Sequence, residues 1–262
     1  MLAPRKLPSE YKIWNRKWNA PYGRDLRGRK YLEKILSKAI LAKLLGRFSI
    51  QPNNDTSAFE YPWAIEAGNL SRGLLAVDLG GGLAGFQFVL DSMGVEVLNV
   101  DPGAEAKGVG WHCDNKSLEE LNRVFGTNVE LINTTLPETN IEPNSIDRVF
   151  SISVIEHFRK RDFDETIEAV IRVLKPGGLF ILTVDLFLDL HPFTKRLTNE
   201  WGQNFEIGNL LKHSAFKPII GDPAELFGSE SFDSEKIQSN LSRYLVGGFY
   251  PVLVQCLVLE KI

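Results

Sequence analysis

Three consecutive glycines behind an aspartate form the most unusual stretch of this 262-residue chain. The sequence VDLGGGLAGF covers Val77 to Phe86, and Gly80, Gly82 and Gly85 fit the spacing G-x-G-x-x-G. Each glycine costs backbone entropy on folding, so such a run implies a backbone that must come close to a ligand. Asp101 follows about 20 residues later, and a carboxylate there could accept hydrogen bonds from both hydroxyls of a ribose. The pattern indicates a nucleoside-containing ligand, of which a dinucleotide is one candidate.

Alternating strands and helices surround these residues and must position them. Periodicity predicts helices over 86–93, 117–125 and 162–174. It predicts strands over 74–79, 95–100, 129–133, 147–153, 179–186, 216–220 and 250–260. This rhythm is typical of an α/β fold with a mostly parallel sheet. In such a sheet the ligand binds at the carboxyl ends of the strands, where the glycine loop and Asp101 lie.

Local signals set the expected ends of several elements. Ser117 and Glu120 predict a capping box for the helix that Gly126 stops, and KPGG at 175–178 predicts the end of the following helix. Apolar residues at helical spacing predict one helix over 29–45. Residues 1–28 show no clear periodicity and are interpreted as an arm or an irregular lid.

Asp78 and the motifs downstream of it distinguish among nucleoside cofactors. A carboxylate two residues before the first glycine suits a cationic amine better than a pyrophosphate. The ordered motifs VDLGGGLAGF, VLNVDPG, ISVIEHF and VLKPGGLFILTV resemble those of the class I S-adenosylmethionine-dependent methyltransferases, in particular the subgroup that acts on small molecules, lipids or glycans. The resemblance covers residues 70–186. It implies a doubly wound, seven-stranded, Rossmann-like sheet that ends in an antiparallel hairpin, formed by residues 70–262 behind an N-terminal basic arm and helical cap over 1–69.

The resemblance also implies roles for individual residues in holding S-adenosylmethionine. Asp78 would bind the amine, the glycine loop the methionine part, and Asp101 with Pro102 the ribose. An acid often stands at the end of the third strand in this family, but this chain has INTTLPE there, so Asn133 or Thr134 would contact the adenine. The implied cofactor residues are Asp78, Gly80, Gly82, Gly85, Asp101, Pro102, Asn133, Thr134, Ser151 and Ser153.

Three residues are candidates for a general base, which a hydroxyl acceptor would need. His157 follows the fourth predicted strand, and histidine titrates near neutral pH. Asp185 lies near the end of the fifth strand, and His191 follows it. A structural role for His157, as a helix start or as packing over the cofactor, is the alternative.

Other motifs narrow the chemistry. The D/N-P-P-Y/F motif of base amino-group methylation is replaced by SVIEH, and neither Cys113 nor Cys256 follows a proline, as cytosine-C5 enzymes require. No cluster of His, Cys and Asp has metal-ligand spacing, so we expect no metal. The two distant cysteines indicate a reducing compartment, and with no signal peptide or apolar span in view we expect a cytoplasmic protein.

Charge is distributed unevenly, and the remaining segments suggest where an acceptor binds. Residues 1–50 hold thirteen Lys and Arg against three Asp and Glu, a net charge of +10, whereas the whole chain carries −3. We expect this arm to fold back as a lid, with binding to RNA or a lipid surface as the alternatives. Tyr61 and Trp63 are candidate substrate contacts, with core packing as the alternative, and residues 186–213 and 222–249 are long enough to form a specificity cap.

These observations predict a methyltransferase that uses S-adenosylmethionine and a small-molecule acceptor, a sugar or an acidic metabolite. RNA or lipid methylation, a nicotinamide-dependent oxidoreductase and a non-catalytic cofactor-binding module are the alternatives. The sequence does not fix the oligomeric state.

Overall fold

The structure is a computed structural model that describes residues 1–20, 31–32, 35–51, 53–103 and 113–262. Seven strands in this part of the chain form one sheet with the order β3-β2-β1-β4-β5-β7-β6. β1, β2 and β3 pair in parallel, as do β4 and β5, whereas β7 runs antiparallel to both β5 and β6. The predicted fold class is therefore confirmed, including the antiparallel hairpin at the end. The strands are β1 (Leu75–Leu79), β2 (Glu96–Val100), β3 (Glu130–Ile132), β4 (Ile146–Ile152), β5 (Leu174–Phe187), β6 (Phe216–Ile220) and β7 (Val252–Lys261).

The chain folds as two compact units. The N-terminal unit comprises residues 8–140, and the C-terminal unit comprises residues 1–7 together with 141–262. The expected boundary between a cap over 1–69 and a catalytic domain over 70–262 stays a prediction.

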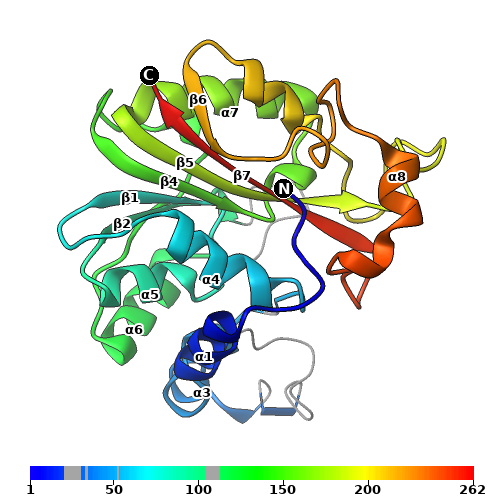
Figure 1. The fold of residues 1–262 in the computed structure, drawn as a ribbon. Helices are drawn as coiled ribbons and strands as arrows, with labels where there is room; N and C mark the ends of the chain where they lie inside the picture. The colour runs from blue at the N-terminus through cyan, green and yellow to red at the C-terminus, as the bar shows by residue number, and fades with distance from the viewer. Residues whose placement is uncertain (21–30, 33–34, 52, 104–112) are drawn as a thin grey trace. The chain divides into compact units, whose positions relative to one another are not determined.

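The N-terminal unit places its helices around β1, β2 and β3. Figure 1 shows α5 and α6 beside β1 and β2. Phe48, Phe59, Phe86 and Phe88 are fully buried in its core. Its helices are α1 (Ser9–Trp18), α3 (Lys38–Leu45), η1 (Arg47–Ser49), α4 (Ser57–Ala67), α5 (Phe86–Ser92), α6 (Asn115–Phe125) and η3 (Leu136–Glu138).

The C-terminal unit is built on β4, β5, β6 and β7, which bury Phe150, Phe180 and Phe187 completely. The first residues of the chain also belong to it, because the amide of Ala3 donates to the carbonyl of Val254 in β7 at 2.9 Å and Leu2 is buried. Its helices are η4 (Ile155–His157), α7 (Lys160–Val173), η5 (Ile207–Lys212), α8 (Ser234–Ser239) and η6 (Leu241–Arg243).

Some predicted element ends are wrong, each for a local reason. α6 begins one turn earlier than the proposed capping box, because the side chain of Asp114 accepts from the amide of Ser117 at 2.8 Å. α7 ends at Val173, and Lys175–Gly178 form the bulged start of β5 rather than a turn.

The N-terminal segments differ from the prediction as well. Residues 9–18, interpreted as irregular, form helix α1. Within the single helix expected over 29–45, residues 31, 32 and 35 are helical, but the helix is interrupted at Leu36 and Ser37. A separate helix, α3, then begins at Lys38, because the side chain of Ser37 accepts from the amide of Ile40. Residues 29–30 and 33–34 of that prediction lie outside the described residues.

Candidate functional site

The glycine loop joins β1 to α5, and its backbone explains the glycines. Gly80, Gly82 and Gly85 all have positive φ values, of 67°, 52° and 103°. A Cβ atom on Gly85 would lie 2.7 Å from the carbonyl oxygen of Arg47. At this position glycine is required both by the left-handed backbone and by the close approach of η1.

Four side chains that sequence reasoning missed hold the loop in place. The carbonyl of Gly82 accepts from the Gln87 amide at 2.9 Å, from the Asn99 amide at 2.8 Å and from the Cys113 thiol at 3.3 Å. The Gln51 side chain accepts from the amide of Leu83 at 2.8 Å. A signal existed for Asn99, an amide in an otherwise apolar strand, whereas Gln51 lies in a segment whose composition indicated only a linker.

Asp101 acts as a clamp at the end of β2. One carboxylate oxygen accepts from the amide of Gly82 at 2.8 Å and the other from the amide of Gly103 at 2.6 Å. Burial raises the pKa of Asp101, and these two hydrogen bonds oppose that shift. Each oxygen keeps a second lone pair, so the predicted contact with ribose hydroxyls is compatible with this clamp.

Asp78 carries a buried carboxyl group that a cationic ligand would stabilise. It is 3% exposed, and its Oδ2 atom has no hydrogen-bond partner among the described residues. Burial, and secondarily the charge of Asp101, raises the pKa of Asp78 to about 8. A Cβ on Gly81 would collide with this carboxylate, so only a glycine leaves room beside it. These features fit a cofactor that carries an ammonium group.

The residues predicted around the adenine and ribose lie at the ends of β2 and β3. Asn133 is exposed, and its side-chain amide donates to the carbonyl of Asp101 at 2.8 Å. The hydroxyl of Thr134 donates to the side chain of Glu138 in η3 at 2.7 Å. Pro102 is half-buried next to Asp101. The structure thus brings Asn133 together with Asp101, while the Thr134 hydroxyl is already engaged.

Tyr61 and Trp63, the candidate substrate contacts, are buried in α4. The ring of Tyr61 stacks on Phe86 with centroids 5.5 Å apart, and its hydroxyl donates to the side chain of Asn53. Burial raises the pKa of Tyr61. These contacts favour core packing in support of the glycine loop, and the predicted contact with an acceptor stays a prediction without support.

In the C-terminal unit, two serines mark the end of β4. Ser151 is fully buried, and its hydroxyl oxygen has no hydrogen-bond partner in the described part of the chain. Ser153 has a φ of 52°, a backbone conformation that is uncommon without glycine and concentrates at functional sites. Its amide donates to the carbonyl of Thr183 in β5 at 3.0 Å.

His157 lies in a loop that is paired with a second loop 44 residues further along the chain. Its Nδ1 atom is 2.6 Å from the carbonyl oxygen of Trp201. The amide of Gln203 donates to the carbonyl of Glu156 at 3.0 Å, and its side chain donates to the carbonyl of Phe158 at 2.6 Å. A carbonyl only accepts, so Nδ1 carries the proton and Nε2 has the free lone pair. Desolvation of the ring lowers the pKa of His157, and the Trp201 bond opposes this shift.

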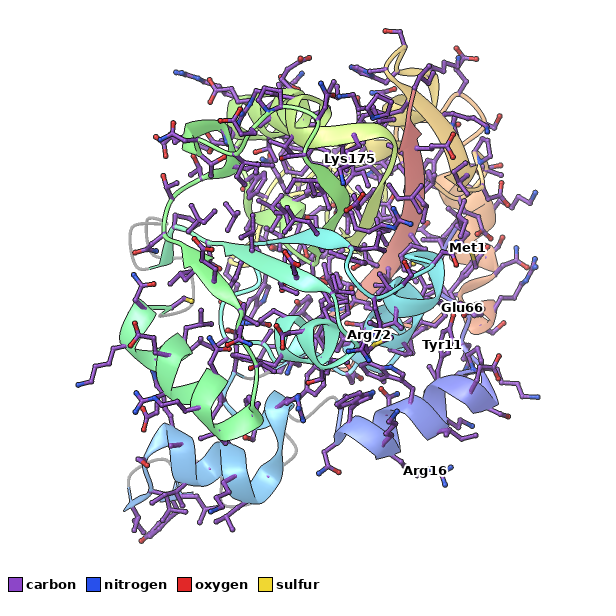
Figure 2. The ribbon with its side chains drawn as sticks, turned by 90° about the vertical axis from the view of Figure 1, so that its left-hand side faces the viewer. Met1, Tyr11, Arg16, Glu66, Arg72 and Lys175 are labelled. Atoms are coloured by element: carbon purple, nitrogen blue, oxygen red, sulfur yellow. The ribbon has the colours of Figure 1, made fainter. Side chains whose placement is uncertain are left out.

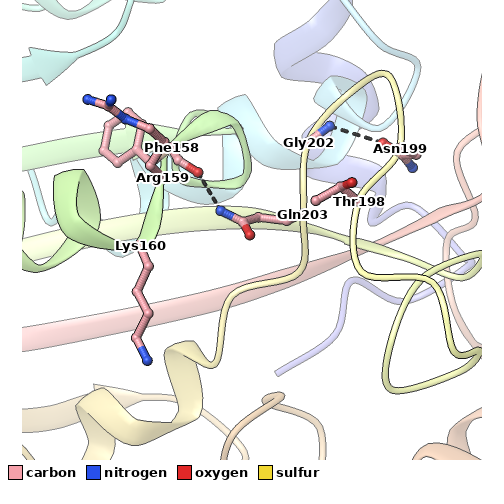
Figure 3. Close-up of a pocket in the computed structure, with 7 residues that line it drawn as sticks. All are labelled: Phe158, Arg159, Lys160, Thr198, Asn199, Gly202 and Gln203. Carbon is pink, nitrogen blue, oxygen red and sulfur yellow. Dashed lines mark hydrogen bonds between the residues drawn. The ribbon is translucent and has the colours of Figure 1, made fainter.

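The two paired loops also line a shallow hollow of about 400 Å³, shown in Figure 3. Two basic side chains, those of Arg159 and Lys160, line it, and Arg159 forms a salt bridge with Asp162 at 2.7 Å. The lining residues are Phe158, Arg159, Lys160, Thr198, Asn199, Gly202 and Gln203.

Asp185 and His191 occupy different surroundings. Asp185 is buried near the end of β5, and the hydroxyl of Tyr250 donates to it at 3.0 Å. The ring of Trp201 stacks on Tyr250 with centroids 4.9 Å apart, which links Asp185 to the loop that holds His157. The exposed His191 instead packs edge-on against Phe227. Of the three candidate bases, the structure therefore connects His157 and Asp185.

The described residues contain no group of three His, Cys, Asp or Glu side chains able to hold a metal ion. Among them there is also no helix with the length and apolarity that a membrane span requires.

Comparison with known proteins defines the class to which this fold and loop belong. Residues 77–182 match the sequence model of the methyltransferase domain. A search of curated proteins finds no match to the chain. The match spans the glycine loop, the end of β2 and the His157 loop, so the nicotinamide-dependent oxidoreductase is set aside. Residues 77–182 therefore form a methyltransferase domain, and the predicted enzyme class and cofactor, an S-adenosylmethionine-dependent methyltransferase, are confirmed.

Solved structures share the fold at low sequence identity. The PH0226 protein of Pyrococcus horikoshii is 21% identical, with a TM-score of 0.51 over 80% of this chain and 94% of that one. The 1,6-didemethyltoxoflavin N1-methyltransferase of Burkholderia thailandensis is 16% identical, with a TM-score of 0.50 over 99% and 94%. The [4+2]-cyclase SpnF is 12% identical, with a TM-score of 0.56 over 99% of both chains. A cyclase among them shows that the fold alone does not fix the reaction.

Proposed function

We propose that this enzyme transfers a methyl group to a hydroxyl of a small polar acceptor, a sugar or an acidic metabolite, with His157 as the general base. The observation that carries the proposal is the 2.6 Å contact between Nδ1 of His157 and the Trp201 carbonyl. This contact fixes the tautomer that leaves Nε2 as a proton acceptor. The lowered pKa favours the neutral ring at physiological pH, the state a base requires.

The cofactor half of the proposal rests on the N-terminal unit. Bound S-adenosylmethionine supplies an activated methyl carbon on a sulfonium. Asp78 would neutralise its ammonium group, because that carboxylate is buried and its Oδ2 lacks a partner in the described residues. Asp101 would bind the ribose and Asn133 the adenine. The backbone of the glycine loop would contact the methionine part of the cofactor. Ser151 and Ser153 stay predicted cofactor residues, as the resemblance of ISVIEHF to the family implies.

The acceptor half rests on the paired loops of the C-terminal unit. The side chains of Lys160, Asn199 and Gln203 in the lining of the hollow suit hydroxyls and an acidic group. Residues 186–213 and 222–249 would act as the specificity cap, because the two segments contact each other. Trp201 of the first segment packs edge-on against Phe249 of the second, with ring centroids 5.3 Å apart. Asp185 is the second candidate base, favoured by its bond from Tyr250. Both cysteines are buried and free, which is consistent with a reducing compartment, and a cytoplasmic location stays a prediction.

Turnover of labelled cofactor with panels of sugars and organic acids tests the proposal. Once an acceptor is found, His157→Ala should lower kcat by about 10²–10⁴-fold and leave the cofactor Kd within a few-fold. His213→Ala is the matched control, because His213 lies in the same unit but outside the paired loops, where its ring accepts from the amide of Ala215 and packs against Phe216. The wild-type kcat should stay high below pH 6.5 and fall only where His157 becomes protonated. An unchanged kcat in His157→Ala would mean that another group removes the proton from the acceptor hydroxyl, and Asp185→Asn would then be the next variant to measure.

A further inference from the structure

The outer sides of α1 and α3 expose several large apolar side chains. Ile13 on α1 is 63% exposed, and Ile40 and Leu44 on α3 are 47% and 67% exposed. Ile40 and Leu44 stand four residues apart and so share one side of the helix. Tyr31 and Ile35, just before α3, are 76% and 70% exposed. Half of the ten exposed large apolar residues in the described chain thus fall between residues 13 and 44, a concentration that marks an interaction surface.

Basic side chains accompany these apolar residues. Lys12, Arg16 and Lys17 are exposed on α1 and Lys43 on α3, while Glu10 is the one acidic residue in the two helices. Figure 2 shows Arg16 pointing away from the rest of the unit. A helix with an apolar and a cationic surface together is typical of segments that lie on membranes.

The opposite side of α1 is already occupied within the N-terminal unit. The hydroxyl of Tyr11 donates to Glu66 in α4 at 2.5 Å, and the side chain of Asn15 donates to the carbonyl of Ala58 at 2.8 Å. Tyr11 and Glu66 are labelled in Figure 2. These contacts anchor the inner side of α1 to α4, so the outer side of α1 stays available to a partner.

α1 and α3 meet at their C-terminal ends. A Cβ atom on Gly46, which follows α3, would lie 3.5 Å from the Cβ of Asn19, which follows α1. The guanidinium of Arg47 lies 5.0 Å from the centroid of the Trp18 ring, a cation–π contact that joins the same two ends. The two helices thus belong to one exposed region of the N-terminal unit.

We propose that this surface, formed by Lys12, Ile13, Arg16, Lys17, Ile40, Lys43 and Leu44, binds an anionic lipid surface. Each aliphatic side chain gains by leaving water for the lipid interface, and each Lys or Arg gains by approaching anionic headgroups. The charge distribution of the whole chain supports binding to anionic lipid through this surface. Residues 1–50 carry +10, so the remaining residues carry −13 and are repelled from the same lipids. RNA would use the cations but would leave Ile40 and Leu44 in water.

Sedimentation of the full chain with vesicles tests the proposal without requiring an acceptor or turnover. We expect binding to vesicles of equal parts phosphatidylglycerol and phosphatidylcholine, and much weaker binding to phosphatidylcholine alone. The exposed double variant Ile40→Ser/Leu44→Ser should lower the partition coefficient at least tenfold. Lys12→Glu/Lys17→Glu should abolish binding. Cofactor affinity, measured in the same preparations, reports that each variant is folded.

Leu197→Ser is the matched control, because Leu197 is 70% exposed but lies in the C-terminal unit. Its partition coefficient should equal that of the wild type. Failure of the wild type to bind the anionic vesicles at low salt would overturn the proposal, and so would equal binding by Ile40→Ser/Leu44→Ser. Salt-sensitive binding of single-stranded RNA that is lost in Lys12→Glu/Lys17→Glu but kept in the apolar double variant, without vesicle binding, would identify RNA as the partner instead. None of these outcomes depends on the identity of the methyl acceptor.

Discussion

The glycine loop of the N-terminal unit and the paired loops of the C-terminal unit are held in different ways. The first is fixed by several hydrogen bonds that converge on one short segment, with Gly82 bonded through both its amide and its carbonyl. The second is fixed by a few bonds between Glu156–Phe158 and Trp201–Gln203. A cofactor common to a whole family suits a rigid, local loop, whereas the acceptor-binding part can change as soon as either paired loop changes.

The largest effect should come from replacing a glycine of the rigid loop. Gly85→Ala places a side chain at a φ of 103° and 2.7 Å from the carbonyl of Arg47. Backbone strain and overpacking together should lower the free energy of unfolding by about 2–6 kcal/mol, measured by urea denaturation. Gly126→Ala is the control, since its φ is also positive but nothing lies within 4 Å, and it should cost only about 1–2 kcal/mol. Equal costs for the two variants would show that the loop is not tightly packed.

Removing the clamp should affect the cofactor more than the fold. Asp101→Ala deletes the acceptors of the amides of Gly82 and Gly103, and with them the proposed ribose contact. The affinity for S-adenosylhomocysteine, measured by calorimetry, should fall by about 1.5–3 kcal/mol, or about tenfold to 150-fold. Asp101→Asn keeps one acceptor oxygen, so its affinity should lie between those of the wild type and of Asp101→Ala. An unchanged Kd in the alanine variant would restrict Asp101 to a structural role.

The pH dependence of cofactor binding gives a smaller and more specific effect. Because the folded-state pKa of Asp78 is about 8, above its unfolded value, the group favours the folded apo protein at low pH and loses that contribution as pH rises through 8. Binding an ammonium group requires the carboxylate form. Affinity for S-adenosylhomocysteine should therefore rise with pH up to about 8, by at most about tenfold per pH unit, and then level off.

Calorimetry in two buffers of different ionisation enthalpy detects the proton released when the Asp78 carboxyl group ionises. Asp78→Asn keeps the titration of the ligand's own amine and so isolates the protein group. It should bind more weakly and without proton release. A wild-type affinity that is flat between pH 6 and pH 8 would show that Asp78 is already ionised in this range, and an unchanged Kd in Asp78→Asn would exclude Asp78 as the partner of the amine.

The smallest effect should separate the acceptor half from the cofactor half. Tyr250→Phe removes the hydrogen bond to Asp185, and we expect the acceptor KM to rise by about 2–10-fold at constant cofactor Kd. Tyr244→Phe is the matched control, because Tyr244 also donates to a carboxylate, that of Glu225 at 3.0 Å, in the same unit. It should leave KM unchanged. The same change in both variants would mean that Asp185 and Tyr250 act only through stability.

The sequence by itself determined the fold class, the glycine loop, the acids at the ends of β1 and β2, and the methyl-transfer chemistry. All of these depend on short segments in which residue type and spacing are sufficient, such as Asp78 before Gly80. Tertiary structure alone decided which distant residues meet. Gln51 reached the loop from a segment that resembled a linker, and Trp201 reached His157 across 44 residues. It also placed Tyr61 and Trp63 in the core and left Ile40 and Leu44 exposed. Periodicity shows that a helix has an apolar side, but only the packing of the other elements decides whether that side is covered.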